Sequence, residues 1–186
     1  MAVTLSSIAP KAVFSAILNN AIDGSARPAA TRKHGKTYKP NTTLANGAGA
    51  NQADRVWEDT ARDLTSGNSE NIDLYDFGTL DIGAGAGLDA LGQSLALAEI
   101  VEILVYNSHD SDGDLVIGAE GSGAAWSAYN GSDSVQITTL SPGAWWHHFD
   151  PTDGALPVAD STNHLLKMAA SGGDVEYNIH ILGRSA

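Results

Sequence analysis

The sequence predicts an all-β fold, an antiparallel β-sandwich or jelly roll, preceded by an N-terminal helix and an extended basic arm. From about residue 54 onward, short apolar runs alternate with segments rich in Gly, Asp, Asn and Ser, which is the pattern of short strands joined by turns. Apolar and polar residues alternate over residues 175–182, as on a half-buried antiparallel strand. A chain of 186 residues is also long enough to bury one substantial core.

The N-terminal residues have a different pattern. Apolar residues recur at helical spacing over residues 5–22, Ser7 can cap a first turn, and Pro10 suits a helix start. The expected helix therefore begins near residue 8 or 9 and ends at Asp23-Gly24. Residues 24–53 are rich in Gly, Ala, Pro, Asn and Lys without periodicity, which indicates an extended arm.

These patterns divide the chain into an anchoring segment, residues 1–53, and a β-sandwich body, residues 54–186. Within the body, nine short runs separated by turn residues are candidate strands. They are Arg55–Glu58, Glu70–Tyr75, Leu95–Tyr106, Asp114–Ile117, Ala125–Ala128, Val135–Leu140, Ala144–Phe149, Leu165–Ala169 and Val175–Leu182.

The charge is distributed very unevenly along the chain. Residues 1–62 carry eight basic and four acidic groups, a net charge of +4, whereas residues 63–186 carry two basic and 18 acidic groups, a net charge of −16. The overall charge of −12 argues against a body that binds nucleic acid or an anionic membrane. No apolar run approaches the roughly 18 residues needed to cross a bilayer.

The anchoring segment holds the candidate interface residues. It can be a solvated tail, a nucleic-acid contact, or an arm that binds an acidic neighbour, most simply another copy of the chain. Nucleic acid is disfavoured, because Tyr38 is the only aromatic residue near the cations that could stack on a base. The candidate anchoring residues are the apolar Phe14, Ile17 and Leu18 and the cationic Arg27, Arg32, Lys33, Lys36 and Lys39.

No constellation of residues predicts catalysis, a cofactor or a metal site. The chain has no cysteine, which excludes disulfides and thiolate chemistry. The carboxylates Asp110, Asp112 and Asp114 resemble a calcium loop, but Gly113 is in the wrong position, so a turn is the preferred interpretation. No Walker motif, nucleophile elbow or zinc-protease motif is present, and a glycosidase dyad cannot be assigned among 18 acids.

Residues 145–149, Trp-Trp-His-His-Phe, form the most unusual segment. In a strand, Trp145, His147 and Phe149 would lie on one face and Trp146 and His148 on the other. The preferred interpretation is an aromatic strand in the core or at a subunit interface. The alternative is a sugar-stacking platform formed by Trp126, Trp145 or Trp146.

Two stretches resemble small proteins encoded in the structural gene clusters of tailed bacteriophages. The first is Leu44–Leu64 followed by Glu70–Leu74, and the second is a Leu-Leu run at 165–166 followed by a Tyr-x-Ile-x-Ile-x-Gly strand ending at Gly183. The matching positions in the first stretch are Asn46, Gly47, Gly49, Ala50, Asn51, Gln52, Ala53, Asp54, Trp57, Asp59, Arg62, Leu64, Glu70, Asp73 and Leu74.

The resemblance covers roughly residues 44–186 and implies a virion-associated β-sandwich that assembles and catalyses no reaction. The expected function is a non-enzymatic phage structural protein in the virion, most simply a capsid decoration, cement or minor head protein. It would form a homo-oligomer through its N-terminal arm and contact other virion proteins such as a major capsid protein. A tail or connector component, or a carbohydrate-binding or receptor-binding module, remains the alternative. The anchoring segment, a glycine-rich insert around residues 76–90 and the Trp-Trp-His-His strand depart from the family pattern.

Overall fold

The computed structural model describes residues 12–20, 30–38, 44–77, 87–88, 94–118, 120–129, 131 and 136–186. These residues form β-strands and contain no helix, and therefore no helix that could cross a membrane. The strands are β1 (Ala12–Asn20), β2 (Ala30–Tyr38), β3 (Arg55–Leu64), β4 (Ser69–Asp73), β5 (Leu97–Asn107), β6 (Asp114–Gly118), β7 (Gln136–Leu140), β8 (Trp145–Phe149), β9 (Leu165–Ser171) and β10 (Val175–Ser185).

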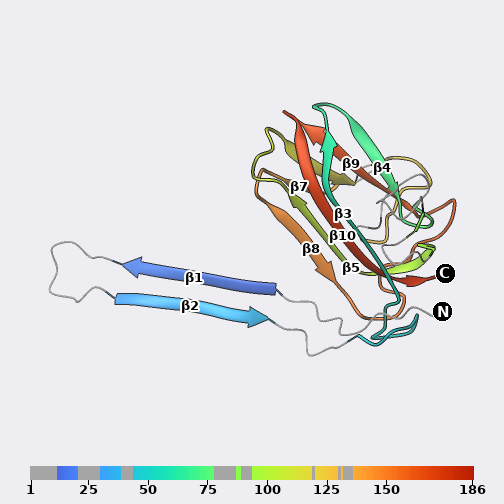
Figure 1. Cartoon of the computed structure of the whole chain (residues 1–186), viewed down its shortest axis with the longest axis horizontal. Helices are drawn as coiled ribbons and strands as arrows, with labels where there is room; N and C mark the ends of the chain where they lie inside the picture. Colours follow the sequence, from blue (N-terminus) through green and yellow to red (C-terminus); the bar gives the residue numbers. More distant parts are fainter. Residues whose placement is uncertain are drawn as a thin grey trace.

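Eight of these strands form two antiparallel sheets, which confirms the predicted all-β class. One sheet has the order β3-β10-β5-β8 and the other the order β4-β9-β6-β7 (Figure 1). Strands at the same position in the two orders are consecutive in the chain: β3 leads into β4, β5 into β6, β7 into β8 and β9 into β10. Each short connection therefore carries the chain from one sheet to the other.

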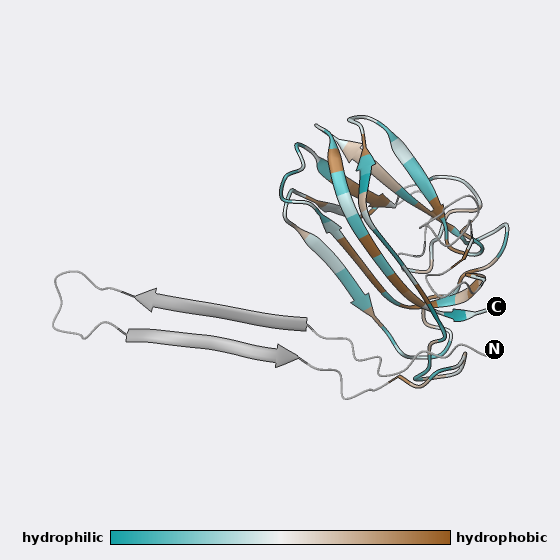
Figure 2. Ribbon diagram, viewed as in Figure 1, coloured by the Kyte–Doolittle hydropathy of each residue, from teal (hydrophilic) through white to brown (hydrophobic). Residues whose placement is uncertain are grey.

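One hydrophobic core lies between the two sheets. Trp57, Ile103 and Ile179 from the first sheet and Leu115 and Leu166 from the second are all buried in it. Hydrophobic and hydrophilic residues alternate along β10, so one face of the strand packs inward and the other faces outward (Figure 2). This alternation produces the predicted half-buried strand at residues 175–182.

The candidate strand Ala125–Ala128 is wrong. Ala125 makes only an isolated bridge to Leu165. The next two amides make single bonds to the start of β9 and to the loop before it, without a ladder: the Trp126 amide donates to the Leu165 carbonyl and the Ser127 amide to the Asn163 side chain. The apolar run is buried because it packs as a loop on the core, and its backbone groups are satisfied without a ladder.

The predicted N-terminal helix is also corrected by the structure. Ala12–Asn20 forms β1, which pairs antiparallel with β2 in a separate two-stranded sheet (Figure 1). Val13, Phe14 and Ile17 are residue types that favour strands. The remaining helix and arm residues, 8–11, 21–29 and 39–43, lie outside the described residues, and the division at residue 53 stays a prediction.

Candidate functional site

The ribbon of β1 and β2 brings six of the eight predicted anchoring residues into register. Phe14 is opposite Lys36, Ile17 is opposite Lys33, and Leu18 is opposite Arg32. Each apolar candidate therefore has a cationic candidate directly across the ribbon, although the two groups are far apart in the sequence. The other two candidates, Arg27 and Lys39, lie outside the described residues.

Residues 44–54 attach the arm to the body. Leu44 and Ala53 are buried against Val101 and Leu182, on the face of the β3-β10-β5-β8 sheet that points away from the main core. The segment is folded back on itself, since the Ala45 amide donates to the Asn51 carbonyl and the Ala53 amide to the Ala45 carbonyl. Residues 44–54 therefore pack on the body before the chain enters β3.

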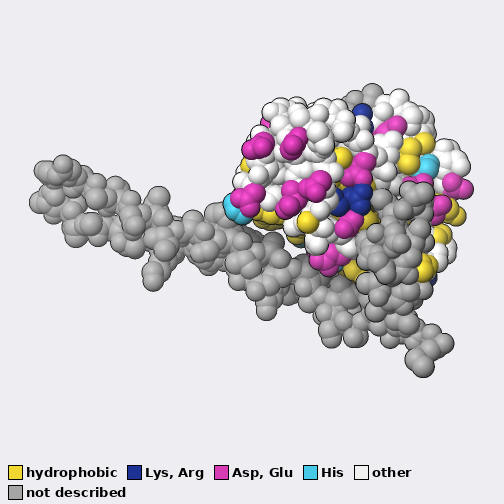
Figure 3. All heavy atoms as spheres, turned by 45° about the horizontal axis from the view of Figure 1, so that its top comes forward, with side chains coloured by type: hydrophobic (Ala, Val, Ile, Leu, Met, Phe, Trp, Pro, Cys, Tyr) yellow, Lys and Arg dark blue, Asp and Glu magenta, His cyan; other side chains and the backbone are white. Residues whose placement is uncertain are grey.

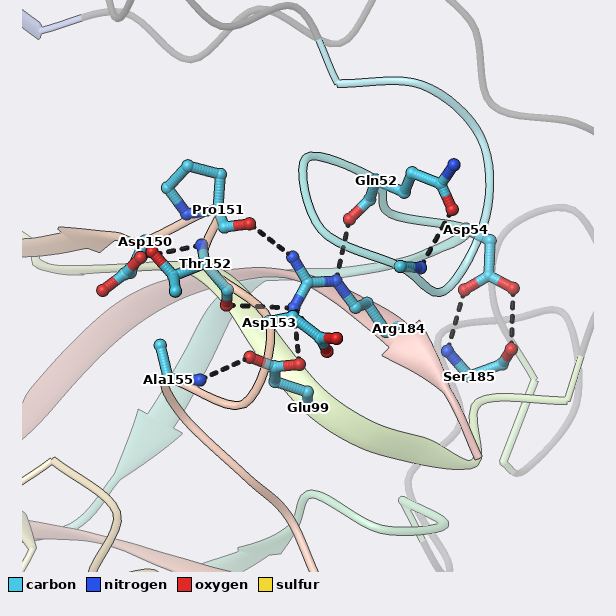
Figure 4. A network of polar contacts seen from close by, with 11 residues as sticks. Gln52, Asp54, Glu99, Asp150, Pro151, Thr152, Asp153, Ala155, Arg184 and Ser185 are labelled. Carbon is cyan, nitrogen blue, oxygen red and sulfur yellow. Dashed lines mark hydrogen bonds and ion pairs between the residues drawn. The ribbon is translucent and has the colours of Figure 1, made fainter.

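A buried arginine, Arg184 on β10, fastens this segment. Its Nε donates to the Gln52 carbonyl at 3.1 Å, and its Nη2 donates to the Pro151 carbonyl at 2.7 Å (Figure 4). Its Nη1 donates to the Thr152 carbonyl at 3.1 Å and to Glu99 Oε2 at 2.5 Å. Glu99 Oε1 in turn accepts the Ala155 amide at 2.8 Å. We call Arg184, Glu99 and these backbone partners the arginine clasp.

The clasp joins four parts of the chain that lie far apart in sequence. The guanidinium is only 1% exposed, so its charge depends on Glu99 and the three carbonyls for stabilisation. Beside it, Ser185 donates from its amide and its hydroxyl to the two carboxylate oxygens of Asp54, at 2.8 and 2.7 Å (Figure 4). Together these bonds hold the entry of β3 against the end of β10.

Sequence reasoning missed the clasp. One signal could have found it: Arg184 is one of only two basic residues after residue 62, and it stands in the most regular apolar strand. A lone charge in such a strand points to a buried, paired group. Its acceptors could not have been identified, because three of them are backbone carbonyls in loops.

The three candidate tryptophans differ in burial. Trp126 is 3% exposed and donates from Nε1 to the Pro157 carbonyl at 3.1 Å. Trp146 packs against the core and meets Tyr129 edge-on, with ring centroids 5.1 Å apart. Trp145 is 56% exposed and points away from the core. The described residues therefore present one of these tryptophans to solvent and no coplanar set.

Trp145 lies on the outward side of the β3-β10-β5-β8 sheet, which we call the outer face. His147 lies beside it, with ring centroids 6.2 Å apart, and contacts Glu102 of β5 through Nε2 and Oε1 at 2.8 Å. Phe149 follows on the same side and packs with residues 44 and 53. The predicted alternation of residues 145–149 is thus observed.

Asp110 and Asp112 lie in the β5–β6 connection, where a turn was predicted, and Asp114 is the first residue of β6. Asp110 and Asp112 line an open hollow of about 250 Å³ with Asp63, Asp174 and Glu176. Among the described residues, no three His, Cys, Asp or Glu side chains converge in a way that could hold a metal ion. The loop is held by its backbone, since the amides of Asp112 and Gly113 both donate to the Asp174 carbonyl.

A second polar network lies at the edge of the two sheets that is formed by β3 and β4. Arg62 of β3 donates to both Glu70 of β4 and Asp59, and the Tyr177 hydroxyl of β10 donates to Glu70 at 2.7 Å. Burial, and then the Glu70 carboxylate, raise the pKa of Tyr177 above its ordinary value, so the phenol stays protonated. Burial by itself would lower the pKa of Arg62, but the bonds to Glu70 and Asp59 outweigh it and raise the pKa.

The described residues form an all-β protein with two antiparallel sheets, a separate basic ribbon and a buried arginine clasp within the body. Comparison with protein-family models, curated proteins and solved structures found no match to this chain.

Proposed function

We propose that this chain is a non-enzymatic structural protein of a tailed-phage virion that self-associates through its N-terminal arm. The observation that carries the proposal is the ribbon of β1 and β2. It forms a sheet of its own, it pairs apolar with cationic positions, and residues 44–54, further along the same arm, pack on the body. An element with these properties is suited to bind a neighbouring subunit.

The topology of the body supports a jelly roll. Two four-stranded sheets in which every facing pair is consecutive in the chain correspond to the double-sheet arrangement of that architecture. Viral capsid proteins use it, although lectins and cupins do as well, so the fold alone does not select a function. The family resemblance of residues 44–186 favours the virion among these classes.

The charge distribution supports assembly through the arm. The acidic side chains are spread over the visible surface of the body, with few Lys or Arg side chains between them (Figure 3). Bodies that carry a net charge of −16 over residues 63–186 repel one another, and a cationic arm from each copy offsets this repulsion. In a repetitive particle, many such weak contacts act together.

Within the virion, we propose a capsid decoration, cement or minor head protein that contacts a major capsid protein. A tail or connector component is the alternative in the same class. The carbohydrate-binding alternative is weaker, because Trp126 is buried and Trp146 packs on the core, which leaves Trp145 as the only exposed tryptophan among the candidates.

Sedimentation velocity of the full chain tests self-association. The wild type should form oligomers at micromolar concentration, and the arm-neutral variant Arg32→Ser, Lys33→Ser, Lys36→Ser should remain monomeric. The proposal would be refuted if the wild type sediments as a monomer and its copies make no contact with one another on purified particles. Electron microscopy of native particles gives the location: density on the head supports decoration, a ring at the portal or tail supports the connector alternative, and absence from the particle excludes both.

A further inference from the structure

The outer face carries rows of side chains that run across its four strands. By strand register, one row contains Trp145, Tyr106 and Asn178, and the next contains His147, Leu104, His180 and Glu58. A third row contains Phe149, Glu102, Leu182 and Val56, of which the apolar members pack with residues 44 and 53. The chain thus covers the third row with its own segment and leaves the first two rows more open.

The two open rows, together with the Glu176–Asp63 pair next to them, combine apolar area with negative charge. Trp145 is 56% exposed at the edge strand β8, and Tyr106 and Leu104 beside it are only partly buried. Three exposed carboxylates lie at these positions, and none of these positions carries Lys or Arg. They are Glu58 in the second row and the paired Glu176 and Asp63 next to the first row.

The β1–β2 ribbon has the complementary composition. Phe14, Ile17 and Leu18 supply apolar groups, and Lys36, Lys33 and Arg32 stand opposite them in register. The ribbon contains no Asp or Glu, whereas the two open rows and the Glu176–Asp63 pair contain no Lys or Arg. Charge complementarity and apolar content therefore identify the same occupant for this face.

We propose that the outer face, centred on Trp145, Tyr106 and Leu104, is the docking site for the β1–β2 ribbon of a second copy of this chain. The inference rests on the proposed self-association and specifies where it occurs. The third row supports it, because residues 44–54 show that this face already binds a segment of the N-terminal region.

The ribbon comes from a second copy for two reasons. In the single chain, β1 and β2 pair with each other and with no strand of the body. The same single chain leaves Trp145 more than half exposed. Because the ribbon and the outer face are different surfaces, the contact is heterologous. Each copy can place its ribbon on the outer face of one neighbour and accept the ribbon of another neighbour on its own outer face.

Complementation between two full-length variants tests this arrangement. The arm-neutral variant keeps the face but loses the cations, and a face variant, Glu58→Lys with Glu176→Lys, keeps the arm but reverses two carboxylates. Each variant alone should sediment as a monomer. An equimolar mixture should form a 1:1 complex, because the native arm of one variant binds the native face of the other. A mixture that stays monomeric would overturn the proposal.

Two matched variants complete the test. Asp76→Lys with Asp160→Lys makes the same change in net charge at two exposed positions that lie on no strand of the outer face, and it should assemble like the wild type. Trp145→Ala should raise the dissociation constant about tenfold or more, as expected for a central aromatic anchor. If the wild type assembles and the arm-neutral variant does not, while the face variant assembles normally, self-association stands and this docking site is wrong.

Discussion

Removing the guanidinium of the arginine clasp should destabilise the whole fold. Arg184→Met leaves the Glu99 carboxylate in a site where the side chain is 6% exposed, with only the Ala155 amide as a partner. It also removes the donor from three carbonyls, those of Gln52, Pro151 and Thr152. Breaking a buried ion pair from one side costs about 3–5 kcal/mol, chiefly because an uncompensated charge stays buried. We expect a loss of that size in the free energy of unfolding.

The loss can be measured by thermal and urea unfolding of the full chain. For a domain of this size, 1 kcal/mol corresponds to about 2–4 °C in Tm, so a shift of about 6–20 °C is expected. The double variant Arg184→Met, Glu99→Met is the control, because it removes both charges and replaces them with apolar volume. It should recover most of the stability. If Arg184→Met costs less than about 1 kcal/mol, the clasp does not hold the fold as argued.

Three further predictions concern other parts of the body. Tyr177→Phe removes the hydroxyl that donates to Glu70 at 2.7 Å and should cost about 1–3 kcal/mol in urea unfolding; a neutral result would contradict a structural role for this network. Gly113→Ala should cost about 1–3 kcal/mol, because its Cβ would lie 2.5 Å from a backbone oxygen, whereas Gly123→Ala, with open space around it, should be nearly neutral; equal effects would refute the close approach. Burial lowers the pKa of His148, so the unfolded chain binds the proton more tightly, and stability should fall as the pH drops below about 6.5; His148→Gln should weaken this dependence, and an NMR titration giving a pKa at or above 6.5 would contradict it.

The strands of the body were predictable because their signal is local. Eight of the nine candidate strands are present, since alternation of apolar and polar residues directly reflects one buried and one exposed face. The two errors arose where that local signal was ambiguous. Ala125–Ala128 is apolar because it packs on the core as a loop, and residues 12–20 fit a helical pattern while their strand partner lies 18 residues further along the chain.

The candidate site was predictable only in its residue types. Phe14, Leu18, Arg32 and Lys36 could be chosen for hydrophobicity and charge, but their pairing across the ribbon depends on register. The clasp depends on loops brought together by the fold, and no spacing in the sequence encodes it. The same is true of the outer face, whose rows combine residues from β3, β5, β8 and β10.

The internal ion pairs take up most of the cations of the body. Of the four basic residues after residue 54, three are engaged within the fold: Arg55 pairs with Asp54, Arg62 with Asp59 and Glu70, and Arg184 with Glu99. These pairs neutralise carboxylates at or near the buried network and leave the outward carboxylates of the outer face without Lys or Arg beside them. Lys167 lies on β9, in the other sheet. Apposing two such faces would therefore bring like charges together, whereas apposing one face and one ribbon brings opposite charges together. The electrostatics of the body thus favour a head-to-tail contact through the arm over a symmetric contact between two outer faces.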